Sequence, residues 1–238
     1  MPYNFNMRIA DLDVSVQSKY KFTYDLCNQY ISENGGDVIA AATEEEIKKE
    51  TLLVPGTIPE YAESICIYRN LADKLPLLDR IVFHGAVITY NDDAYLFTAP
   101  SGTGKTTHIK LWRQYLGKCV DIVNGDKPIL HITDTVTAYG TPWCGKEGFQ
   151  KNRKATLKGI CVITRGTDNK TERLSGDKAL EYIMRQVYFP NEPQAVLKTL
   201  SLIDKLIKTV PCFICSVDMS ENAVKSTFEA LTNKKYGE

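Results

Sequence analysis

The nine residues from 99 to 107, Ala-Pro-Ser-Gly-Thr-Gly-Lys-Thr-Thr, constrain the fold of this chain more than any other segment. They follow an apolar run at 94–98 that is typical of a β-strand, and they precede a run at 107–115 that is typical of a helix. A phosphate-binding P-loop requires this order of strand, loop and helix. The segment therefore predicts an α/β protein that binds a nucleoside triphosphate.

The residue types inside the loop suit phosphate binding. Gly102 and Gly104 allow the backbone to turn sharply and to bring its N–H groups close to an anion, and the following helix N-terminus adds partial positive charge. Lys105 can reach the β- and γ-phosphates, and the Thr106 hydroxyl can ligate Mg²⁺. One departure is Ala99, which stands where the usual pattern has glycine. The predicted nucleotide-binding residues of the loop are Ser101, Gly102, Thr103, Gly104, Lys105, Thr106 and Thr107.

The composition is that of an ordinary soluble globular protein, because 24% of the 238 residues are charged and 43% are apolar. The 29 basic and 29 acidic residues cancel, which argues against dedicated binding of nucleic acid or of a membrane surface. The first residues contain no apolar segment of signal-peptide length, and no apolar run approaches the ~18 residues that a bilayer span needs. We therefore expect a cytoplasmic protein without nucleic-acid or membrane partners.

The seven cysteines are odd in number and widely spaced, which predicts reduced thiols. Cys212 and Cys215 have the spacing of a redox motif, but they lie inside the apolar run 210–217. A buried strand that uses cysteine as a small apolar residue is the better interpretation.

Residues 1–76 are predicted to form a small N-terminal α+β unit that packs on a core of residues 77–238; alternatively, the two form one compact domain. In the N-terminal unit the segment 19–31 is ambiguous between helix and strand. The expected strands there are 9–16 and 38–41, and the expected helices are 43–50 and 59–77.

The core pattern predicts a mixed sheet flanked by helices and rich in hairpins, since strands and helices do not alternate strictly. A long loop is expected at 140–152. The expected strands are 81–83, 86–90, 94–98, 118–123, 129–133, 136–139, 157–164 and 211–217, and the expected further helices are 176–187, 192–208 and 222–232.

Several segments carry a family resemblance. His84-Gly85 precedes Ala99 by about fifteen residues, Ile-Val-Asn-Gly-Asp at 122–126 ends the next strand, and Leu-Lys-Gly-Ile at 157–160 follows. Together with the loop at 101–107, they resemble the HPr kinase/phosphorylase family and the C-terminal nucleotide-binding lobe of phosphoenolpyruvate carboxykinase. The resemblance covers about residues 80 to 165.

This resemblance implies the P-loop kinase fold of that family and an ATP- and Mg²⁺-dependent transfer of the γ-phosphate to a hydroxyl group. The acceptor is then a serine in a protein or peptide, or a small metabolite; similar kinases include enzymes that modify ribosomally made peptides. Family members are often oligomeric, so a homo-oligomer is one expected assembly. A carboxykinase-like reaction is a weaker expectation, because the chain has no room for an acid-binding lobe.

The chain departs from the family pattern at the proposed reaction centre. HPr kinases carry two adjacent aspartates where this chain has Gly125-Asp126, and their loop ends in Ser-Glu rather than in Thr106-Thr107. Asp126, just past a strand end, is the best carboxylate to hold Mg²⁺ together with Thr106 and to act as the base. His84 is an alternative base or a phosphate and metal contact. The missing carboxylate also motivates a second hypothesis, a nucleotide-binding regulatory protein without catalysis.

The loop after this strand is dense in functional side-chain types. Trp143 is predicted to stack on a base or to cap the acceptor, and Lys146 to add positive charge at the transferring phosphate. Glu147 is a further candidate base, and Arg153 a candidate cationic clamp on the nucleotide. Glycines at 145 and 148 would permit a mobile lid. Asp121 is a weaker candidate base because it lies mid-strand, and His108 and His131, on a predicted helix and a predicted strand, are expected to be structural.

Overall fold

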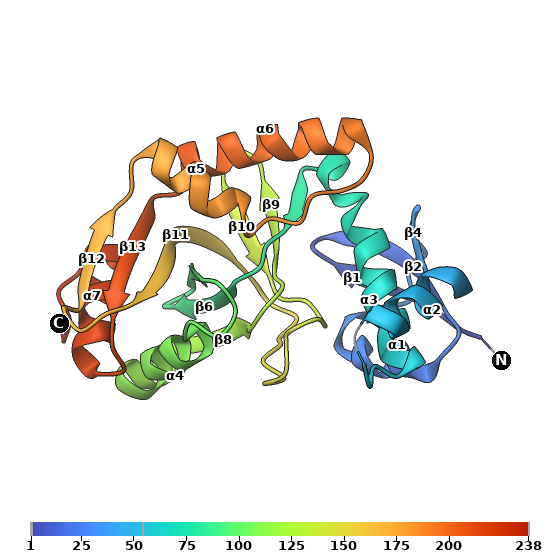
Figure 1. Ribbon diagram of the computed structural model, residues 1–238, viewed down its shortest axis with the longest axis horizontal. Coiled ribbons are helices and arrows are strands. Elements are labelled where there is room, and N and C mark those ends of the chain that lie inside the picture. Colours follow the sequence, from blue (N-terminus) through green and yellow to red (C-terminus); the bar gives the residue numbers. More distant parts are fainter. Residues whose placement is uncertain (1, 54, 238) are drawn as a thin grey trace.

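The computed structural model describes residues 2–53 and 55–237. The chain has a mixed α/β fold with a four-stranded sheet near the N-terminus and a nine-stranded sheet in the rest of the chain (Figure 1). Helices flank the larger sheet on both faces. This arrangement confirms the predicted mixed sheet flanked by helices.

The N-terminal sheet has the strand order β3-β1-β2-β4. Its central hairpin turns at Ala10 and Asp11, which both have positive φ. The predicted strand at 9–16 is therefore wrong: it spans the turn, because neither residue is a glycine or asparagine that would mark one. The strands are β1 (Tyr3–Ile9), β2 (Leu12–Ser18), β3 (Ile31–Ser32) and β4 (Val38–Ala41).

Three helices accompany this sheet: α1 (Lys21–Leu26), α2 (Glu44–Leu53) and α3 (Pro59–Ala72). The ambiguous segment 19–31 contains α1, a 3₁₀ turn and β3. Helix α2 begins with a capping box, in which Thr43 N–H donates to Glu46 Oε2 at 2.7 Å and Glu46 N–H donates to Thr43 Oγ1 at 3.2 Å. This reciprocal pair explains why the polar run at 43–50 forms a helix.

Helix α3 ties the N-terminal sheet to the larger one. Ile67 and Leu71 belong to one buried cluster that includes Met7 and Val14 from the small sheet and Ile129 from the large one. The predicted boundary between residues 76 and 77 falls inside a 3₁₀ turn, Leu75–Leu78, that follows α3. The division of the chain into two units stays a prediction.

The larger sheet has the order β5-β9-β10-β11-β7-β6-β8, and β13 adds to β11 with β12 at its edge. Strand β11 pairs in parallel with β7 and with β13. All other described strand pairs of this sheet are antiparallel. The strands are β5 (Arg80–Val82), β6 (Ala86–Tyr90), β7 (Asp93–Thr98), β8 (Val120–Asn124), β9 (Ile129–Ile132), β10 (Val136–Tyr139), β11 (Lys154–Arg165), β12 (Lys170–Arg173) and β13 (Cys212–Val217).

Alternate residues of the central strands enter two separate cores. In β7, Leu96 packs into the cluster under α5 (Gly176–Met184) and α6 (Pro193–Thr209), while Phe97 packs into the cluster under α4 (Lys105–Leu116) and α7 (Glu221–Thr232). Figure 1 shows these helix pairs on opposite faces of the sheet. Burial of both faces explains why the centre of β7, residues 94–97, is a continuous apolar run.

The hairpins β6–β7 and β9–β10 confirm the two hairpins expected from the sequence. All seven cysteines are free, and Cys212 and Cys215 are buried in β13, as expected of cysteine used as a small apolar residue. In the part of the chain that the structure describes, no helix combines the length and the apolar character needed to cross a bilayer.

Candidate active site

The predicted P-loop connects β7 to α4, and this order of strand, loop and helix is the one that the motif requires. Gly102 has φ +77° and Gly104 has φ +123°, and a Cβ at either position would meet no atom within 4 Å. Backbone conformation rather than crowding therefore requires these glycines. Ala99 is buried and is not among the described residues with positive φ, so its Cβ causes no backbone strain.

The N-terminus of α4 offers free backbone donors to an anion. Its first residue is Lys105, the preceding Gly104 provides no side-chain cap, and the first turn contains no acidic side chain. The unpaired N–H groups and the helix dipole therefore point into the loop, where a phosphate would be stabilised.

Arg165 braces the loop from the end of β11. Its Nη2 donates to the Gly102 carbonyl at 2.6 Å, and its Nε donates to the Thr103 carbonyl at 3.2 Å. Sequence reasoning missed this residue, which lies more than sixty positions further along the chain and has no motif of its own. A guanidinium here holds two carbonyls of the loop and adds positive charge beside the expected phosphates.

Lys105 is only 8% exposed. Its ammonium donates to the Ala99 carbonyl at 3.0 Å and lies 3.3 Å from His84 Nε2. Burial lowers the pKa of Lys105, and the negative charge of Asp126 partly offsets this effect. The side chain is thus held at the base of the loop, directed at the histidine.

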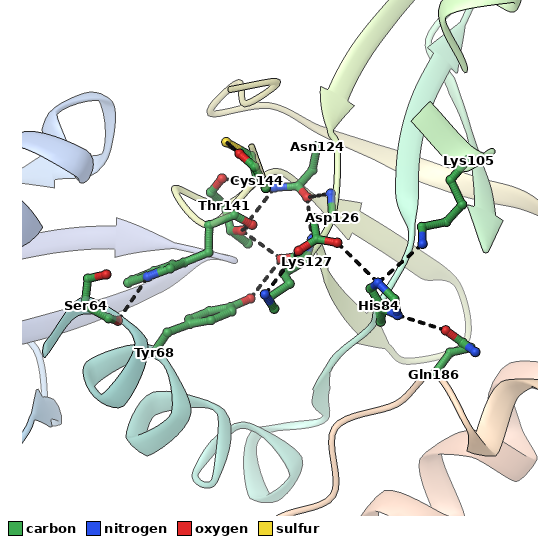
Figure 2. A network of polar contacts seen from close by, with 12 residues as sticks. Ser64, Tyr68, His84, Lys105, Asn124, Asp126, Lys127, Thr141, Cys144 and Gln186 are labelled. Atoms are coloured by element: carbon green, nitrogen blue, oxygen red, sulfur yellow. Dashed lines mark hydrogen bonds and ion pairs between the residues drawn. The ribbon is translucent and has the colours of Figure 1, made fainter. Parts of the chain in front are cut away.

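His84 lies between Lys105 and Asp126 (Figure 2). Its Nε2 is 3.3 Å from Asp126 Oδ1, and its Nδ1 is 3.0 Å from Gln186 Oε1. The backbone fixes the same arrangement, because His84 N–H donates to the Gln186 carbonyl at 2.7 Å and Gly85 N–H donates to the Asp126 carbonyl at 2.9 Å. Gln186, which follows α5, was not predicted from the sequence.

Asn124 positions Asp126 at the end of β8. Its Oδ1 accepts hydrogen bonds from the N–H groups of Asp126 and Lys127 at 2.9 and 2.8 Å, and its Nδ2 donates to Thr141. This Asx turn is a local signal that the sequence does contain, in Asn-Gly-Asp. It aims the carboxylate back toward His84, as Figure 2 shows.

The Asp126 carboxylate is ionised in this environment. Burial raises its pKa, but the close contact with His84 and the charge of Lys127, whose Nζ lies 3.1 Å from Oδ2, outweigh burial and lower the pKa to about 2. An ionised, partly exposed carboxylate next to a P-loop lysine can ligate Mg²⁺ or stabilise a cation.

The structure explains why Gly125 carries no carboxylate. A Cβ at this position would lie 2.8 Å from the Cys144 carbonyl oxygen and 3.4 Å from the Cβ of Phe149. Gly145 packs in turn against Asp126, since its own Cβ would lie 3.1 Å from that of Asp126. A second acidic side chain therefore has no room here, and the single carboxylate is part of how this loop packs.

The structure does not bring Trp143 into the P-loop. Its ring is 5% exposed and stacks on Tyr68 with ring centroids 4.1 Å apart, and its indole N–H donates to the Ser64 carbonyl at 3.0 Å. Trp143 belongs to the core shared with α3, so the expected stacking on a nucleotide base has no support in this arrangement.

The other predicted residues of this region lie apart from one another. Lys146 is exposed and lines a cavity together with His84. Glu147 forms an exposed ion pair with Lys110 of α4 at 2.6 Å. Arg153 pairs with Asp92 and Asp121 at 2.5 and 3.2 Å, away from the His84–Asp126 pair.

The remaining histidines have structural surroundings. His108 is buried between α4 and α7, where Nε2 lies 3.0 Å from Thr227 Oγ1, and burial lowers its pKa to about 4. His131 is half-buried in β9, opposite Arg80 of β5.

Two cavities flank this centre. One, of about 680 Å³, adjoins the P-loop and has apolar walls from α4, β11, the end of β13 and the segment after it, namely Leu111, Ile163, Val217 and Met219. The other, of about 660 Å³, lies between α3 and the segment 185–188 and reaches His84. Both are within the size range of small-molecule sites.

No group of three or more His, Cys, Asp or Glu side chains suited to a metal occurs in the described residues.

Comparisons with known proteins add little. No protein-family model matches this chain, and no curated protein matches it. Among solved structures it is similar to the HPr(Ser) kinase/phosphatase from Coxiella burnetii, with 7% sequence identity over 64% of this chain and 93% of that one, at a TM-score of 0.35. A likeness this weak identifies neither an activity nor a substrate, and the residues of the site are the remaining evidence for a function.

Proposed function

We propose that this protein is an ATP- and Mg²⁺-dependent kinase that transfers the γ-phosphate to a hydroxyl group. The observation that carries the proposal is the continuous contact from Lys105 through His84 to Asp126, which joins the P-loop to a second cavity. A protein that only binds a nucleotide needs the loop but has no use for this connection.

The nucleotide would lie along the loop and the first cavity. Backbone N–H groups of 101–107 and Lys105 hold the phosphates. The base would occupy the cavity of about 680 Å³, whose apolar walls suit a flat aromatic ring. The triphosphate would then end at Lys105, next to His84.

Thr106 and Asp126 are the residues that would hold Mg²⁺. Hydroxyl and carboxylate oxygens are the donors this ion prefers, and it takes few protein ligands because the phosphates and waters complete its coordination. Asp126 meets the requirement for a charged donor, because its pKa of about 2 keeps it ionised at neutral pH. When bound, the ion neutralises charge on the phosphates.

His84 is the side chain best placed to take the acceptor proton. With the Gln186 amide in its present orientation, Nδ1 of a neutral ring carries the proton, and Nε2 has an electron pair that faces the Lys105 ammonium. Phosphates bound in the loop would attract that ammonium and leave the electron pair for the acceptor proton. Nε2 lies 3.3 Å from the Lys105 ammonium, next to which the γ-phosphate would lie. The acceptor oxygen attacks the γ-phosphorus, its proton passes to Nε2, and the bond from the γ-phosphorus to the bridging oxygen breaks to release ADP.

Asp126 would stabilise the histidine that has gained this proton. Its Oδ1 lies 3.3 Å from Nε2, so the imidazolium can donate to it. One carboxylate then serves both the ion and the histidine, which compensates for the absence of a second one at Gly125.

The test is transfer of labelled γ-phosphate from ATP in a cell extract divided into protein, peptide and small-molecule fractions. Label that depends on Lys105, and disappears with Lys105→Ala, would support a kinase and identify the acceptor class. ATP binding with no label in any fraction would favour the alternative of a nucleotide-binding regulatory protein.

A further inference from the structure

The cavity that reaches His84 from the side of α3 has one wall made of residues outside the proposed nucleotide-binding segment. One face of α3 supplies Tyr61, Ile65, Tyr68 and Ala72, at helical spacing, and the opposite side is formed by Val187 and Tyr188. The N-terminal unit is thus the source of half the cavity. Its volume of about 660 Å³ and its apolar walls suit a small molecule or the end of a peptide.

The cavity is strongly basic in a protein whose net charge is zero. Its lining contains Arg69, Lys127, Lys146 and Arg185 but only one acidic side chain, Glu50, which gives a net charge of +3 before His84 is counted. Such a concentration of one charge sign favours an anionic ligand.

These cations are not equally free. Arg69 is 2.9 Å from Glu50, and Lys127 is 3.1 Å from Asp126, so each already forms an ion pair with a carboxylate of the protein. Arg185 pairs with Glu181 at 2.8 Å, but both side chains are more than half exposed, and an exposed pair of this kind is weak. Lys146 forms no ion pair with any described residue and is the cation most ready to receive a ligand.

We propose that this cavity binds the phosphoryl acceptor, and that the acceptor is a hydroxyl compound with an anionic group beside an apolar part. This inference rests on the proposed kinase function for the role of the hydroxyl. The hydroxyl lies at His84, the apolar part packs on the α3 face, and Lys146 and Arg185 bind the anionic group. A free small molecule and the carboxyl end of a peptide offer the same chemistry.

The experiment is a calorimetric titration of the full chain, saturated with ADP and Mg²⁺, using probes that carry all three features. In one arm 3-phenyllactate is compared with its neutral amide, and in the other the tripeptide Ala-Phe-Ser is compared with its C-terminal amide. In at least one arm the acid is expected to bind about tenfold more tightly than the amide, since a hydrogen bond to a charged group accounts for that ratio. The arm that shows the preference identifies the source of the ligand.

Variants locate the preference. Lys146→Gln and Arg185→Gln are each expected to weaken binding of the acid about three- to tenfold and to leave the amide and ADP unaffected. Lys49→Gln is the matched control, because Lys49 is also exposed and lies outside the cavity lining. Equal affinities of acid and amide in both arms, no binding in either, or acid binding unchanged in both cavity variants would overturn the proposal.

The two proposals fail separately. Selective binding of the acid without any Lys105-dependent transfer would refute the kinase and leave the anionic cavity standing. Lys105-dependent transfer combined with equal binding of acid and amide would refute the cavity assignment alone.

Discussion

The two sides of this centre are built in different ways. The proposed phosphate-binding side is one contiguous segment, 99–107, which runs from the end of β7 into the first turn of α4. The proposed acceptor side is assembled from α3, His84, the turn after β8, the loop at 140–152 and the segment 185–188. A phosphate can be bound by backbone N–H groups of adjacent residues, whereas the acceptor requires side chains that only the folded chain brings together.

The lysine and the histidine at the junction join these two sides. Lys105 belongs to the loop, His84 to the assembled side, and their nitrogens lie 3.3 Å apart. Substitutions can therefore separate nucleotide binding from transfer, and the following predictions run from the largest expected effect to the smallest.

His84→Gln should lower the transfer rate about 10²- to 10⁴-fold, which is the usual contribution of a general base, while nucleotide affinity stays within about twofold. Rates and ADP affinity would be measured on the same preparations. His131→Gln is the matched control, because His131 lies in β9 and does not line either cavity. A wild-type transfer rate in His84→Gln would contradict the proposed role of His84 as the base.

Gln186→Leu should lower transfer about 10- to 100-fold, since the carbonyl that orients His84 Nδ1 is lost. The expected signature is a lower turnover number with unchanged nucleotide KM. Gln186→Glu, which keeps an acceptor oxygen at this position, should restore part of the rate. Equal defects in Leu and Glu variants would mean that residue 186 has only a packing role.

Gly125→Ala should destabilise the fold by about 1–3 kcal/mol, as overpacking does, because the new Cβ meets the Cys144 carbonyl. Chemical denaturation measures the free energy of unfolding. Gly176→Ala is the control, since a Cβ there meets nothing within 4 Å. If both variants are equally stable, the absence of a second carboxylate is not explained by packing.

Asp126→Asn should lower the free energy of unfolding at pH 7 by about 1–2 kcal/mol. The folded-state pKa of Asp126 is about 2, below its ordinary value of 3.8, so the ionised carboxylate stabilises the fold above about pH 4 and loses this effect as the pH falls toward 2. The difference from wild type should shrink over that interval. Asp134→Asn, which removes a fully exposed carboxylate, is the matched control variant.

Arg153→Gln should change transfer less than about twofold, because Arg153 pairs with exposed or edge carboxylates rather than with the junction. Steady-state kinetics with varied ATP would check this. A rise of tenfold or more in the KM for ATP would instead support the prediction from the sequence that Arg153 binds the nucleotide.

The sequence predicted most of the core and the loop, because both depend on local patterns. The spacing of Gly102, Gly104 and Lys105 alone predicts a P-loop, and the centres of β7 and β11, at 94–97 and 160–163, are continuous apolar runs. The turn at Ala10 and Asp11 escaped prediction because alanine is not typical of positive φ and no glycine or asparagine accompanies Asp11 there.

The assembled side was predicted only in part. His84 and Asp126 carried a family resemblance, but the roles of Gln186, Arg165 and Arg185 depend on contacts between segments far apart in the chain. Trp143 shows the reverse case: a side chain of functional type fills the core against Tyr68, and no local signal separates these two uses.

The most direct test of the central claim measures nucleotide affinity and phosphate transfer in the same samples of wild type, Lys105→Ala and Asp126→Asn. The account predicts that Lys105→Ala loses both properties, and that Asp126→Asn retains ADP binding but loses transfer. Wild type and Asp126→Asn that bind nucleotide alike and transfer phosphate alike, or not at all, would contradict it.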